Sequence, residues 1–302
     1  MTLSDNARGS LWMGIAMGAF TLNDACMKAV TETMPLYQAM FLRGVLTTVL
    51  IAAIGIRAGT LRFDWAPSDR FWMALRTVGE VGGTLAFLTA LRHMPLANLS
   101  AILQSLPLAV TLAAALLMRE PVGWRRLAAI LVGFCGVLLI VRPGTEGFDR
   151  WSLLGLVSVA FVVLRDLSTR RMSAGLTSIT VAFSAAVSVT VVALAVLPFS
   201  GWAPVRASEM VLIAGASGFL IAGYILIVMA MRVGDIALVA PFRYTSLIFA
   251  VVLGWTIFGQ FPDAFTLLGG AIVIATGLYT FHRERVRGQK LAQPVKAPLR
   301  LR

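Results

Sequence analysis

Ten apolar stretches of about 18 to 24 residues follow one another along the chain, each long enough to cross the bilayer's hydrocarbon core as a helix. They lack the alternating pattern of outer-membrane strands, and short polar segments separate them. The pattern therefore predicts an all-α integral membrane protein with ten transmembrane helices. The predicted spans are Ser10 to Val30, Pro35 to Ile56, Phe71 to Leu91, Pro95 to Met118, Trp124 to Val141, Trp151 to Arg171, Leu176 to Phe199, Glu209 to Met231, Ile236 to Phe258 and Ala264 to Phe281.

Composition agrees with this pattern. Hydrophobic residues make up 58% of the chain and charged residues only 13%, whereas charged residues reach about 25% in soluble domains. The longest interruption between spans, Arg57 to Arg70, is too short for a soluble domain. Function is therefore expected to reside within the membrane.

The formal net charge of +12 raises the question of a nucleic-acid partner, but its distribution indicates a membrane topology instead. With the N-terminus inside, cytoplasmic segments hold 17 basic residues and external loops hold 4. Because basic residues resist translocation, both termini are assigned to the cytoplasmic side of the cytoplasmic (inner) membrane. Residues 286–302 form a basic cytoplasmic tail, and no nucleic-acid partner is expected.

The chain resembles itself at a separation of about 140 residues, as in Gly83 and Gly223 or Arg92 and Arg232. Loop lengths and span order also match, so residues 9–142 form one predicted repeat and residues 151–285 the other. Five helices per repeat is an odd number, so the second repeat enters the membrane from the opposite side. Inverted repeats of this kind are typical of alternating-access transporters with a site near the membrane midplane.

Polar residues within the spans are the candidate binding groups. Arg243 and Tyr244 follow Pro241, which interrupts helical hydrogen bonding, and an arginine at such depth is expected to face a cavity rather than lipid. Gln104, Arg43 and Tyr224 are further candidates to bind substrate. Positive charge in the cavity favours a substrate with a carboxylate, a phosphate or electron-rich carbonyls. For Arg43, a snorkelling or structural role is the alternative.

Arg76 and Glu80 lie one helical turn apart in the third span. Desolvation penalises a carboxylate at this depth, which makes Glu80 the candidate proton carrier. The alternative is that Arg76 and Glu80 form a static buried ion pair.

Two further pairs occupy mirrored depths in the inverted repeats: Asp24 with Lys28, and Asp166 with Arg170, both at i, i+4 spacing. Mirrored charges near opposite membrane faces suit two gates. The alternative is that each pair is an intrahelical ion pair.

Several segments resemble the drug/metabolite transporter superfamily and its EamA-type members. They are NDACMKAV, FLRG, GFCGVLL, ALRHMPLANLSAILQSLPLAVTLAAALLMRE and AMRVGDIALVAPFRYTSLIFAVVLGWTIFGQ. The resemblance covers nearly all of residues 9–285 and is nearest to the branch with bacterial riboflavin and S-adenosylmethionine carriers. It departs at one position, since a glutamate common at the end of each repeat's fourth helix is kept as Glu120 but replaced by Gln260.

This resemblance implies secondary transport of a small metabolite, with a vitamin such as riboflavin as the first expectation. Amino-acid, S-adenosylmethionine or drug transport, in either direction, is the alternative within the superfamily. A passive channel or facilitator is the alternative of another class. No cofactor, metal site or enzymatic activity is expected, because the chain lacks a phosphate-binding glycine loop and a metal-ligand cluster. Protons are the expected coupling ion and lipids the surrounding partner, while the sequence leaves the oligomeric state open.

Overall fold

The computed structural model describes residues 4–61, 63, 67–120, 122–145, 149–173, 176–233 and 235–292, and these residues form helices and short connections. The helices are α1 (Asp5–Thr33), α2 (Leu36–Arg57), α3 (Pro67–His93), α4 (Leu96–Leu103), α5 (Leu106–Met118), α6 (Trp124–Val141), α7 (Arg150–Arg170), α8 (Ser178–Ser200), α9 (Ala207–Val233), α10 (Ile236–Val239), the 3-10 turn η1 (Ala240–Tyr244), α11 (Thr245–Phe258) and α12 (Ala264–Ala292). Gly234 and residues 293–302 of the predicted basic tail lie outside the described residues.

Ten spans are confirmed, but the fourth and ninth are not continuous helices as predicted. The fourth divides into α4 and α5 at Gln104 and Ser105, and the ninth divides at η1. A proline follows or lies within each break: Pro107 in the first turn of α5 and Pro241 in η1. Because proline has no backbone N–H, it cannot donate a hydrogen bond to the preceding helical turn, and the helical hydrogen-bond pattern is interrupted at each break. The two breaks occupy equivalent places in the two repeats.

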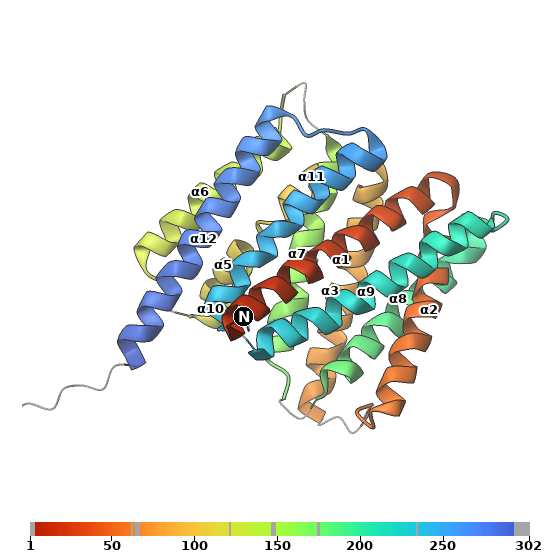
Figure 1. Ribbon diagram of the computed structural model, residues 1–302, viewed down its shortest axis with the longest axis horizontal. Coiled ribbons are helices and arrows are strands. Elements are labelled where there is room, and N and C mark those ends of the chain that lie inside the picture. Colours follow the sequence, from red (N-terminus) through yellow and green to blue (C-terminus); the bar gives the residue numbers. More distant parts are fainter. Residues whose placement is uncertain are drawn as a thin grey trace, which may run out of the picture.

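The helices form one bundle (Figure 1), with α6 and α12 along one edge and α2 and α8 along the opposite edge. We call the end where α1 begins the proximal end and the end where α1 terminates the distal end. Helix direction alternates along the chain, so α3 and α11 end distally, whereas α5, α7 and α9 end proximally.

The most extensive helix contacts all join one repeat to the other. They are α1 with α9, α3 with α7, α12 with α6, and α2 with α8. Exchanging the repeats converts the α1–α9 contact into the α7–α3 contact and maps the other two contacts onto themselves. The chain is therefore an all-α membrane fold of two inverted five-helix repeats whose surfaces interleave.

Glycines at equivalent positions allow this close packing. A Cβ on Gly83 would meet the Val162 side chain at 3.3 Å, and a Cβ on Gly223 would meet the Phe20 ring at 2.8 Å. Phe20 and Val162 are themselves equivalent, at the separation that relates Asp24 to Asp166. The shared glycines thus mark the same helix contact in each repeat.

A carboxylate also forms hydrogen bonds across one end of each of these two equivalent helix contacts, α3–α7 and α1–α9. Asp69, at the start of α3, accepts hydrogen bonds from the backbone N–H of Ser173 at 3.0 Å and from its hydroxyl at 2.6 Å. Its equivalent Glu209, at the start of α9, accepts from the Thr33 hydroxyl at 2.8 Å. Asp69 lies at the proximal end and Glu209 at the distal end, as inversion requires.

Eight helices in the described part of the chain are long and apolar enough to cross a membrane by themselves. The remaining two of the ten, α1 and α3, carry more charged residues and pack on α9 and α7. Asp24 of α1 and Glu80 of α3 line the cavity inside the bundle.

Candidate functional site

A cavity of about 600 Å³ lies between the two repeats. Its lining reaches Ile51, Glu120, Arg170 and Ala182, which lie near the proximal ends of their helices. The cavity therefore opens toward the proximal end. Its charged and amide-bearing lining residues are Asn23, Asp24, Arg43, Glu80, Gln104, Glu120, Arg126, Arg165, Asp166, Arg170 and Arg243.

The distal end is closed by dense apolar packing. Met27, Leu91, Leu96 and Leu99 lie there, and each is at most 1% exposed. None of them lines the cavity. As far as the described residues show, a ligand therefore has access to the cavity from the proximal side.

Nine of the eleven candidate residues line this cavity. They are Arg243, Tyr244, Gln104, Arg43, Tyr224, Glu80, Asp24, Asp166 and Arg170. Arg76 lies behind Glu80 and Lys28 is buried at the distal end, so the structure does not bring these two to the cavity.

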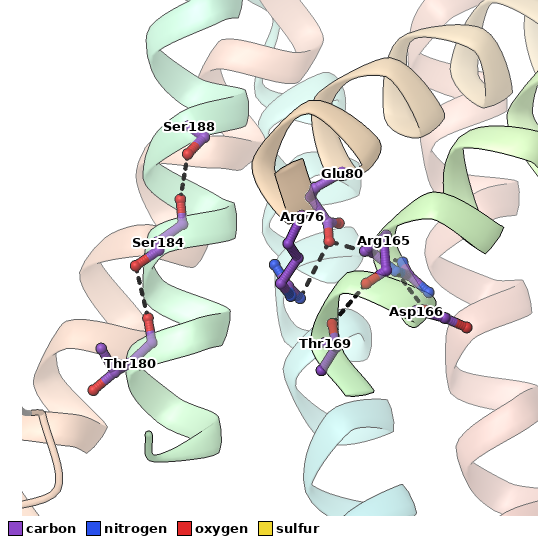
Figure 2. A network of polar contacts seen from close by, with 8 residues as sticks. All are labelled: Arg76, Glu80, Arg165, Asp166, Thr169, Thr180, Ser184 and Ser188. Atoms are coloured by element: carbon purple, nitrogen blue, oxygen red, sulfur yellow. Dashed lines mark hydrogen bonds and ion pairs between the residues drawn. The ribbon is translucent and has the colours of Figure 1, made fainter. Parts of the chain in front are cut away.

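Arg76 and Glu80 belong to a chain of four alternating charges across α3 and α7 (Figure 2). Arg76 lies 3.4 Å from the Glu80 carboxylate, and Arg165 approaches the same oxygen to 3.8 Å. Arg165 also donates to Asp166 at 2.9 Å. Glu80 thus lies between two guanidinium groups. Sequence reasoning did not select Arg165, although an arginine beside Asp166 in an apolar span was a signal for it.

A second polar group joins α1 to α2. Arg43 donates to the Asn23 side-chain oxygen at 3.3 Å, and the Asn23 amide donates to Asp24 at 2.8 Å. Asn23 therefore separates the two charges while linking them. Asn23 was not selected from the sequence, because an asparagine carries no charge to mark it within a span.

The two helix breaks meet at Gln104. Its amide donates to the Tyr244 carbonyl oxygen at 3.1 Å and to the Ser246 hydroxyl at 3.0 Å. The Ser246 hydroxyl in turn donates to the Arg243 carbonyl oxygen at 3.1 Å. Gln104 thereby holds the η1 backbone in place, and its amide is committed to the protein.

Arg243 differs from the other arginines of the site. Its residue is exposed to the cavity, and within the described residues its guanidinium group makes no hydrogen bond or ion pair. Beside it, the Tyr244 hydroxyl is buried against Gly277 of α12 and has no hydrogen-bond partner in the described part of the chain. Tyr244 therefore offers the cavity its ring, while Arg243 offers a free guanidinium.

Helix α8 contributes a largely apolar wall. Ser184 and Ser188 donate their hydroxyls back to the carbonyl oxygens of Thr180 and Ser184, at 2.9 and 2.6 Å, and Figure 2 shows them as a ladder along the helix. Ala182, Ala185 and Ala186 face the cavity instead. The ladder satisfies the hydroxyls within the helix, so they add no polarity to the site.

The charges at the cavity mouth pair across the repeats. Arg170 of α7 lies 3.7 Å from Glu120, just beyond the end of α5. Neither i, i+4 pair forms an ion pair among the described residues, since Asp166 pairs with Arg165 and Lys28 bonds to backbone carbonyls. Each carboxylate lining the cavity thus has a basic partner directly or through Asn23. Among the described residues, Arg243 forms no ion pair with any of them.

These features can bind a small organic solute. A free guanidinium beside an aromatic ring suits a carboxylate, a phosphate or a conjugated carbonyl system. The described residues contain no cluster of three or more His, Cys, Asp or Glu side chains that could hold a metal ion.

A family model described as the EamA-like transporter family matches residues 7–142 and 149–281. Among curated relatives, an S-adenosylmethionine uptake transporter of Rickettsia conorii is 24% identical over 91% of this chain and 92% of the relative. A pseudopaline exporter of Pseudomonas aeruginosa is 25% identical over 88% of this chain and 93% of the relative. A riboflavin transporter of Vibrio cholerae is 27% identical over 88% and 90%.

One solved crystal structure superposes on this fold with a TM-score of 0.61. Its sequence is 21% identical, and the match covers 94% of this chain and 99% of that chain. This similarity extends to the whole arrangement of helices and shows a shared fold.

Proposed function

The chain belongs to the EamA-like transporter family, a family of multi-pass membrane proteins that move small metabolites, and we propose that it is a secondary transporter working by alternating access. The cavity between inverted repeats, accessible from one end only, supports this mechanism. An enzymatic role has no support in the site, which holds neither a nucleophile paired with a base nor a metal cluster in the described residues.

The free guanidinium of Arg243 is the observation that carries the proposal for the substrate. A solute with a carboxylate or with electron-rich carbonyls gives this group the hydrogen-bond partner that it lacks among the described residues. S-adenosylmethionine has a carboxylate and riboflavin has conjugated carbonyls, so both fit. Riboflavin remains the first candidate from the sequence, and S-adenosylmethionine is the second, since its carboxylate can pair with Arg243.

For the topology, we propose that the proximal end faces the cytoplasm. The excess of basic residues in the proximal loops and tail supports this orientation. The conformation described here is then open to the cytoplasm and closed to the outside.

Protons are the proposed coupling ion, and Asp24 is a better candidate to exchange them than Glu80. Glu80 lies within ion-pair distance of both Arg76 and Arg165. Asp24 accepts a hydrogen bond from the Asn23 amide, and Arg43 bonds to the other end of the Asn23 side chain, so no ion pair to Asp24 forms among the described residues. Protonation of Asp24 therefore breaks no direct ion pair with an arginine among the described residues.

Counterflow in proteoliposomes tests the proposed function. Vesicles loaded with unlabelled riboflavin or S-adenosylmethionine are expected to accumulate the labelled form of the same solute transiently. A protonophore is expected to abolish concentrative uptake while leaving counterflow intact. Flux that never rises against a gradient and shows no counterflow would instead identify a passive channel.

A further inference from the structure

Lys28 and Arg170 occupy equivalent positions in the two repeats but are bonded differently. Lys28 is 4% exposed, and its ammonium group donates to the carbonyl oxygens of Leu91 and Met94, both at 2.8 Å. These carbonyls lie at the distal end of α3, where the last carbonyls of a helix have no intrahelical partner and attract a cation. The ammonium also lies 5.5 Å from the ring centre of Phe258.

Arg170 lies at the opposite end with its side chain 52% exposed, facing the cavity mouth. Its partner is Glu120 at 3.7 Å, and an ion pair this exposed contributes little stability. The helix end equivalent to that of α3 is the proximal end of α9, where Met231 corresponds to Leu91. In this conformation Arg170 bonds to Glu120 rather than to that helix end.

The packing shows what each of these bonds joins. Helix α1 packs chiefly on α9, and α3 packs chiefly on α7, so the bundle contains two mixed pairs, α1–α9 and α3–α7. The bond from Lys28 to the end of α3 joins these pairs distally, where the cavity is closed. A bond from Arg170 to the end of α9 joins the same two pairs proximally, where the cavity is open.

We infer that Lys28 and Arg170 act as exchanging clamps that hold the two ends of the carrier closed in turn, an inference that rests on the proposed alternating access. In an inverted-repeat carrier, each repeat takes the arrangement of the other when the site turns to the opposite side. Arg170 then leaves Glu120 and caps the proximal carbonyls of α9, and Lys28 leaves α3 at the distal mouth. Both residues are positioning residues, since they act through the helix ends.

The sequence makes the two clamps unequal. Glu120 gives the released Arg170 a carboxylate, whereas the equivalent position facing the distal mouth is Gln260. At that position a released Lys28 therefore meets an amide where Arg170 meets a carboxylate, and the acidic residue acting on Lys28 is Glu32 of its own helix. This difference favours the proximally open conformation in the absence of substrate, and Gln260→Glu is expected to reduce that preference.

Distances between spin labels on the full chain in nanodiscs test the exchange without substrate. One label pair replaces Glu32 and Arg92 at the distal ends of α1 and α3, and the other replaces Arg171 and Arg232 at the proximal ends of α7 and α9, with Cys26 and Cys135 changed to alanine. Lys28→Met is expected to lengthen the distal distance and shorten the proximal one. Arg170→Met is expected to leave the protein fixed in the proximally open form.

The double variant Lys28→Met/Arg170→Met is expected to return the distances toward a mixture of both forms, and Lys28→Arg to keep the distal end closed. Arg57→Met, which changes an exposed arginine away from the cavity, is the matched control and is expected to change neither distance. Unchanged distances in both Lys28→Met and Gln260→Glu, with the protein monodisperse, would overturn the exchange. Distance changes without any solute transport would support the clamps and count against the proposed function.

Discussion

The Gln104 amide donates a hydrogen bond to the carbonyl oxygen of Tyr244, a residue 140 positions further along the chain and at the equivalent place in the other repeat. Both residues lie at a helix break, so the pseudo-twofold relation of the repeats brings the two breaks together. The contact is asymmetric, because a side chain on one repeat meets the backbone of the other. The same scaffold thus supports different chemistry on its two sides.

Gln104→Leu removes both hydrogen bonds that hold η1 and leaves the Tyr244 carbonyl oxygen without this donor. We expect a loss of about 1–3 kcal/mol in unfolding free energy, the cost of an unsatisfied buried polar group. Thermal unfolding in detergent measures the loss, with Leu103→Ala, a change in the neighbouring lining residue that removes no hydrogen bond, for comparison. A Gln104→Leu protein as stable as the parent would show that η1 does not depend on this contact.

Arg243→Ala is expected to weaken substrate binding by about 10- to 100-fold, since a hydrogen bond to a charged group contributes about 1.5–3 kcal/mol. Arg243→Lys should recover part of the affinity, because the charge remains but bidentate geometry is lost. Calorimetric titration of riboflavin and S-adenosylmethionine provides the measurement. Phe242→Ala, beside Arg243 but not in the cavity lining, is the control. Equal affinities in Arg243→Ala and the parent would remove Arg243 from the site.

Gly277→Ala is expected to displace Tyr244, because a Cβ there would overlap the Tyr244 hydroxyl. Overpacking of this kind costs about 1–3 kcal/mol. Tyr244→Phe removes the nearer of the two overlapping atoms, the hydroxyl oxygen, and leaves the ring carbon Cζ in place, so it relieves part of the overlap. The oxygen is buried without a partner among the described residues, so Tyr244→Phe alone should change stability little. The double variant should therefore be more stable than Gly277→Ala, and a double-mutant cycle measures this coupling. Additive effects would contradict the predicted contact.

Asp24→Asn and Glu80→Gln separate the two candidate proton sites. Glu80→Gln leaves two partly buried arginines without their shared carboxylate, although Arg165 keeps Asp166, and is expected to cost about 1–3 kcal/mol of stability, partly restored by adding Arg76→Gln. Asp24→Asn should fold normally and abolish proton-driven accumulation while counterflow persists. Uptake into vesicles with and without an imposed pH gradient provides the measurement. Proton-driven accumulation that survives Asp24→Asn but is lost in the Glu80→Gln/Arg76→Gln protein would return the role to Glu80.

Apolar length predicted the ten spans well, because the bilayer demands about 20 apolar residues per helix and leaves few alternatives. It did not predict that the fourth and ninth spans divide. Pro107 and Pro241 marked these regions, but a proline is also tolerated in a continuous membrane helix, so position alone did not separate a bend from a break. The EamA resemblance, drawn from motifs along the whole chain, is confirmed by the family match.

Depth along a helix identified residues that line the cavity, yet it did not reveal their partners. Arg43 and Arg243 were expected on similar grounds, but Arg43 is engaged by Asn23 and Arg243 is free. Lys28 and Arg170 likewise share a sequence position and differ in every contact. These differences arise because the two repeats surround each residue with different neighbours, which depth along a helix does not indicate.

The largest helix contacts cross between the two sequence repeats, so the repeats are not independent packing units. Each sequence repeat places its largest surfaces against helices of the other repeat, so neither half presents a finished surface of its own. Under the proposed alternating access, the units expected to move are the pairs α1–α9 and α3–α7, each with one helix from either repeat, rather than the two repeats themselves. A cut between residues 142 and 149 therefore breaks the polypeptide but leaves these contacts between the repeats in place. The two fragments are expected to need each other in order to fold.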